Sequence, residues 1–111
     1  MTVRPPGSFG HSDPTMSGLA TLEYELMAER AYALGRHGAA VEQAIAALNE
    51  AERRGLPEIE LERHCDAAAE AVWGLFVHRE TCGLHNGEDV IKDYGIPGKV
   101  LARLGASPRH P

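Results

Sequence analysis

Aromatic residues and cysteines are scarce in this chain of 111 residues. Phe, Trp and Tyr together make up 5% of the sequence, so we expect a core of Leu, Val, Ile and Ala, the residues of packed helices. Two cysteines are too few for a disulfide scaffold, which favours reduced thiols and a cytoplasmic protein. No apolar run approaches the roughly 18 residues that span a bilayer. The opening residues, MTVRPPGSFGHSDP, lack the apolar segment of a secretory signal.

Positive charge is also in short supply. Lys and Arg number 11 and Asp and Glu number 16, which gives a net charge of −5. Binding to phosphates needs a basic surface, so this balance argues against nucleic acid as a partner. The only mildly basic segment is 84–111, with four basic and three acidic residues.

Proline and glycine gather at the two ends of the chain, where they disfavour both helix and strand. We therefore predict a flexible N-terminal arm over 1–16, a single helical domain over 17–105 and a loose C-terminal tail over 106–111.

Between the ends, apolar residues recur at helical spacing, and no segment shows a strand pattern. Leu19, Leu22 and Leu26 form one apolar stripe near the start. The segment GRHG at 35–38 is expected to end that first helix, because it holds two glycines. The predicted fold is all-α: a small bundle of three main helices followed by a pair of short ones. The predicted helices are residues 17–34, 39–54, 57–82, 87–94 and 97–104.

The third predicted helix carries a long seam spaced by three and four residues. Small residues beside the seam would let another helix approach closely. Either other helices of the same chain cover it, or a second copy does so and makes a homodimer. In an antiparallel dimer centred on Ala71, His64 of one copy would face His78 of the other. The seam residues, and hence the candidate interface, are Leu61, Cys65, Ala68, Val72 and Leu75.

The stretch HRETCGLHNGED is the strongest candidate for a metal site. His78 and Cys82 lie four residues apart on one helix face, and His85 follows the glycine that ends the helix. Structural zinc needs four ligands, and only three are local. A small buried Cys82 and two histidines outside the core explain the same residues. We therefore expect no metal and no cofactor, with zinc bound by His78, Cys82 and His85 as the alternative.

A second alternative is DNA binding by a helix-turn-helix over 87–104. Its second helix would offer Lys99 and Arg103 to the bases, and two cations are weak evidence on an acidic protein.

Catalysis has less support than either of these alternatives. Cys82 falls at a helix C-terminus, where the helix dipole disfavours a thiolate. There is also no glycine-rich phosphate loop after a strand. We assign no catalytic residue.

The segments ALGRHG, FVHRETCGL and VIKDYGIPGKVLARLG resemble a small uncharacterised bacterial family of all-helical proteins. The resemblance implies a compact helical protein of unknown function and brings no site residues. The function is therefore left unknown, and a non-catalytic helical module is favoured. Such a module would contact a second copy, as a homodimer, or another protein partner.

Overall fold

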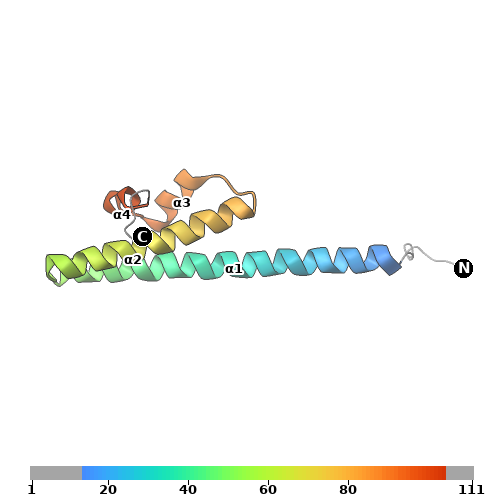
Figure 1. The fold of residues 1–111 in the computed structure, drawn as a ribbon, viewed down its shortest axis with the longest axis horizontal. Helices are drawn as coiled ribbons and strands as arrows, with labels where there is room; N and C mark the ends of the chain where they lie inside the picture. Colours follow the sequence, from blue (N-terminus) through green and yellow to red (C-terminus); the bar gives the residue numbers. More distant parts are fainter. Residues whose placement is uncertain (1–13, 105–111) are drawn as a thin grey trace, which may run out of the picture. The chain divides into compact units, whose positions relative to one another are not determined.

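The computed structural model describes residues 14–104, and their backbone forms helices with no strand (Figure 1). The predicted all-α class is confirmed. The expected arm over 1–13 and tail over 106–111 lie outside the described residues, whereas residues 14–16 belong to the first helix. The helices are α1 (Pro14–Arg53), α2 (Glu58–Thr81), α3 (Gly87–Tyr94) and α4 (Gly98–Ala102).

The predicted break at GRHG is wrong. α1 continues through residues 35–38, so two long helices and two short ones replace the three main helices expected from the sequence. A glycine inside a helix costs about 1 kcal/mol relative to alanine. At Gly38 that cost accompanies a packing requirement, because a Cβ there would overlap the Tyr94 hydroxyl on α3. Close packing between helices, rather than a chain stop, explains this glycine.

The other predicted boundaries hold to within a few residues. Gly55 and Gly83 follow α1 and α2 with φ of 68° and 80°, the left-handed conformation that glycine adopts without strain. α3 spans the predicted residues and follows Asn86. α4 is shorter than expected, since Pro97 precedes the helix and Ala102 is its last residue.

The chain divides into two compact units between Tyr32 and Ala33, and the prediction of a single domain stays a prediction. In the second unit, α2 lies beside the later part of α1, and α3 and α4 follow from its end (Figure 1). All four helices contribute side chains to one buried core. That core contains Val41, Ile45, Leu48, Cys65, Ala68, Ala69, Val72, Leu75, Val90, Ile96 and Val100.

The seam of α2 is therefore covered within the chain. Cys65 is 4% exposed, Val72 is fully buried, and Leu61 at the end of the seam is half-buried. Four of the five candidate interface residues, Cys65, Ala68, Val72 and Leu75, are buried in this core against apolar side chains of α1, α3 and α4, whereas Leu61 is only half-buried. The homodimer stays a prediction, and these four side chains are not free to form its interface in this fold.

In the first unit, every described side chain from residue 17 to residue 32 is exposed. Within the described part of the chain, no helix is both long and apolar enough to cross a membrane.

Candidate functional site

The three candidate zinc ligands take separate roles. His78 lies on α2 with its ring against His37 of α1, at a centroid separation of 5.0 Å and a tilt of 32°. His85 points its Nδ1 toward Glu80, with 3.7 Å between Nδ1 and the carboxylate oxygen. Cys82 is the partly buried residue that closes α2. Over residues 14–104, no three side chains of the metal-binding types gather as a metal ion would require.

The contact between His37 and His78 belongs to a tightly packed junction of α1, α2 and α3. The Nδ1 atom of His37 lies 3.4 Å from where a Cβ on Gly74 would stand, so the imidazole rests against the α2 backbone. The next residue of α1 is Gly38, and the Tyr94 hydroxyl lies in the space that a Cβ would occupy there. The sequence pattern predicted no role for His37. The signal that could have indicated one is the pair of glycines around it, Gly35 and Gly38, inside a helical pattern.

This junction joins the three segments that carry the family resemblance. ALGRHG contributes His37 and Gly38, FVHRETCGL contributes His78, and VIKDYGIPGKVLARLG contributes Tyr94. The segments meet through ring and backbone packing. Their shared pattern therefore describes how the helices fit together.

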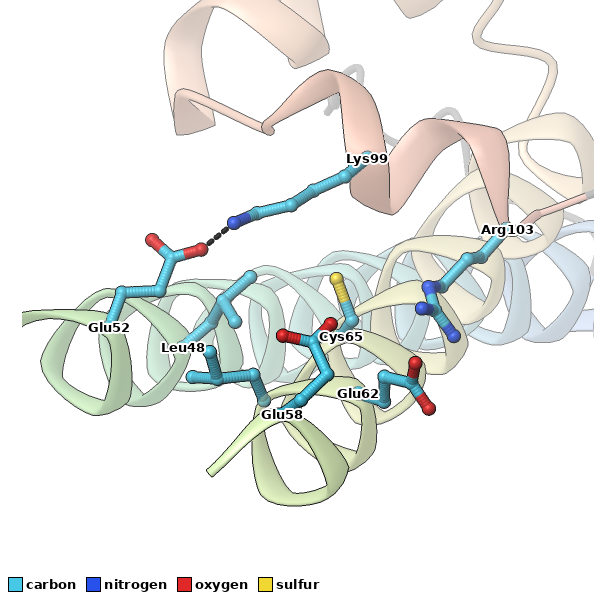
Figure 2. A pocket seen from close by; sticks show the side chains of 8 residues that line it. Leu48, Glu52, Glu58, Glu62, Cys65, Lys99 and Arg103 are labelled. Atoms are coloured by element: carbon cyan, nitrogen blue, oxygen red, sulfur yellow. Dashed lines mark ion pairs between the residues drawn. The ribbon is translucent and has the colours of Figure 1, made fainter. Parts of the chain in front are cut away.

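A charged cleft of about 280 Å³ lies where α4 meets α1 and α2 (Figure 2). Lys99 of α4 forms an ion pair with Glu52 of α1. Arg103, one turn later, donates from Nη1 to Oδ1 of Asp66 on α2 at 2.5 Å. That hydrogen bond is the main reason why the pKa of Arg103 is raised above its ordinary value. The cleft is lined by Leu48, Glu52, Glu58, Leu61, Glu62, Cys65, Lys99 and Arg103.

These ion pairs bear directly on the helix-turn-helix alternative. Its two base-contacting cations were Lys99 and Arg103, and both are turned onto carboxylates of the same chain. α4 itself has only five residues. Both cations therefore form ion pairs between the α4 region and the α1–α2 pair, and these contacts do not support DNA recognition.

The exposed apolar surface of the first unit is the strongest remaining candidate. Leu19, Leu22 and Leu26, here called the leucine stripe, are 52%, 52% and 48% exposed. Their spacing of three and then four residues places them on one face of α1. Carboxylates border this face: Glu25 and Glu29 on one side and Glu23 on the other, by helical geometry.

The fold and this surface define an all-α protein with a buried core shared by its four helices and an exposed leucine stripe on α1. Comparison with known families places the chain in a family of unknown function (DUF6665), whose model matches residues 11–111. The chain belongs to this family, which confirms the resemblance to an uncharacterised family seen in the sequence. No curated protein and no solved structure matches the chain.

Proposed function

We propose that the protein is a non-catalytic helical interaction module, and that the leucine stripe of α1 is its contact surface. The observation that carries this proposal is the exposure of Leu19, Leu22 and Leu26, each about half accessible on one face of a helix. Single exposed leucines are ordinary on protein surfaces, but an aligned row on one helix is typical of a binding face.

The energetics support the same proposal. Removing a leucine side chain from water contributes about 1.5–3 kcal/mol, so three half-exposed leucines leave a substantial gain for a partner to realise. Most helical stability in proteins comes from packing of an apolar face, whereas the described side chains of residues 17–32 are all exposed. A partner along the stripe would supply that packing to residues 17–32.

The partner is either a second copy, as in the homodimer expected from the sequence, or a different protein. A homodimer would have to use a surface other than the buried seam of α2. Both forms of the proposal require the leucine stripe to be covered in the working state of the protein.

Position-specific photo-crosslinking in the cells that naturally make the protein tests this. A photoreactive phenylalanine analogue is placed at Leu22, on the stripe, or at Ala28, an exposed position on the other side of α1. We expect a discrete adduct from position 22 and none from position 28. The adduct's mass distinguishes a dimer from a complex with another protein. Absence of an adduct at both positions, or equal adducts at both, would overturn the proposal.

A further inference from the structure

Resting on the proposed function, we infer that the partner of the leucine stripe is a leucine-rich amphipathic helix with basic flanks, supplied by a different protein. Three observations lead to this assignment: the spacing of the leucines, the negative charge around them, and the position of Glu29.

The spacing selects a helical partner. Leu19, Leu22 and Leu26 follow the three-then-four rhythm by which one helix packs along another. The exposed Tyr24, Met27 and Tyr32 lie on other faces of α1, so the three leucines form a row of their own. A single facing helix can bury such a row, with its own apolar residues between the leucines.

The charges select a basic partner. Residues 17–32 contain Glu23, Glu25 and Glu29 and one basic residue, Arg30, so their net charge is −2. Glu23 and Glu25 border the stripe on opposite sides, and Glu29 lies on the side of Glu25, at the position that continues the spacing after Leu26. Lysine or arginine on the flanks of the facing helix would pair with them, while acidic flanks would be repelled.

Glu29 disfavours a second copy. It takes the next position of the rhythm after Leu26, where a symmetric pair of helices would need an apolar residue. In a parallel pair the two Glu29 side chains face each other, and in an antiparallel pair each is pushed against apolar side chains. A carboxylate held in such a seam without an opposite charge is costly. A cation on the partner removes that cost.

Two synthetic 21-residue helical peptides test the inference with the full-length protein. Both carry leucine at every seam position of three heptads. One has lysine at the flanking positions and the other glutamate. Fluorescence anisotropy is measured at low and at 0.5 M salt. We expect at least tenfold tighter binding of the lysine peptide, with the difference reduced at high salt because screening weakens exposed charge pairs.

Variants separate the stripe from general charge attraction. Leu22→Glu and Ala28→Glu add the same charge, but only the first touches the stripe. We expect Leu22→Glu to weaken binding of the lysine peptide at least tenfold and Ala28→Glu to leave it within twofold. Glu29→Leu should weaken the preference for lysine and let the protein form a dimer at tens of micromolar in sedimentation equilibrium.

The outcomes keep the two proposals apart. Equal binding of both peptides overturns the basic partner but leaves the interaction module standing. So does a wild-type dimer that Leu22→Glu dissociates, because the occupant is then a second copy. Lysine-peptide binding that is unchanged by Leu22→Glu overturns the assignment to the stripe. If neither peptide binds and position 22 gives no crosslink, both proposals fall.

Discussion

The hydroxyl of Tyr94 on α3 occupies the space that the Cβ of any other residue would need at position 38 of α1, where the sequence has glycine. This contact explains a glycine that looks like a helix stop in the sequence. It also fixes how closely α3 approaches α1, and it makes the two residues dependent on each other.

Gly38→Ala should destabilise the protein by about 1–2 kcal/mol, because overpacking costs about 1–3 kcal/mol and the gain in helix propensity returns up to about 1. Gly35→Ala is the matched control in the same helix. Nothing lies within 4 Å of a Cβ there, so we expect a gain of about 0.5–1 kcal/mol. Urea unfolding followed by circular dichroism measures both changes.

The dependence between the two residues is tested by adding Tyr94→Phe to Gly38→Ala. Without the hydroxyl, the nearest ring carbon lies 3.4 Å from the new Cβ, an ordinary contact distance. The double variant should recover about 1 kcal/mol relative to the sum of the single changes. Strict additivity would show that the hydroxyl is not what excludes a side chain at position 38.

Ala68→Glu should abolish the cooperative unfolding transition. Ala68 is fully buried, and a carboxylate at this position would be buried without a partner. Had the seam been a dimer interface, the same change would have dissociated two folded chains. Val72→Ala is the milder companion, with an expected loss of roughly 2 kcal/mol from a deleted buried side chain. A folded monomeric Ala68→Glu protein with wild-type stability would contradict the core assignment.

The ion pair between Arg103 and Asp66 should contribute little stability. Its side chains are 33% and 41% exposed, and pairs at such positions contribute about 0–1 kcal/mol. A double-mutant cycle with Arg103→Leu and Asp66→Asn measures the coupling. We expect it to fall further in 0.5 M salt. A coupling above about 2 kcal/mol would mean that the pair is far better shielded from water than its exposure indicates.

The two free thiols should differ in reactivity. Cys65 is buried in the core and Cys82 is partly exposed at the end of α2. A thiol reagent such as Ellman's should label Cys82 first under native conditions and reach Cys65 only as the fold opens. Cys82→Ser removes the fast phase and serves as the control. A fast phase that survives in Cys82→Ser would place Cys65 at the surface.

Zinc should neither co-purify with the protein nor raise its melting temperature. The His78 ring lies against His37, His85 lies beside Glu80, and no group of three possible ligands forms among residues 14–104. A metal raises stability only by binding the folded state. Elemental analysis and thermal melts with a tenfold excess of zinc measure this. Stoichiometric zinc that is lost in both His78→Ala and Cys82→Ser would revive the metal alternative.

Much of the fold could be predicted from local pattern. Three- and four-residue spacing indicated the helices, and four of the five buried positions of α2 are the predicted seam residues Cys65, Ala68, Val72 and Leu75. Gly55 and Gly83 marked helix ends because each adopts a positive φ, which other residues resist. These features are local, since they depend on neighbours within about one helical turn.

What the pattern could not determine was which surfaces meet. A glycine that ends a helix and a glycine that admits a tyrosine hydroxyl are the same letter in the sequence, and only the position of α3 distinguishes them at Gly38. A seam that faces another helix of the chain and one that faces a second copy also share one spacing. Local propensity depends on residues that are neighbours in the sequence, whereas the choice of partner surface depends on packing between distant segments. Only the tertiary structure therefore decided that the seam of α2 is buried and that the leucine stripe is exposed.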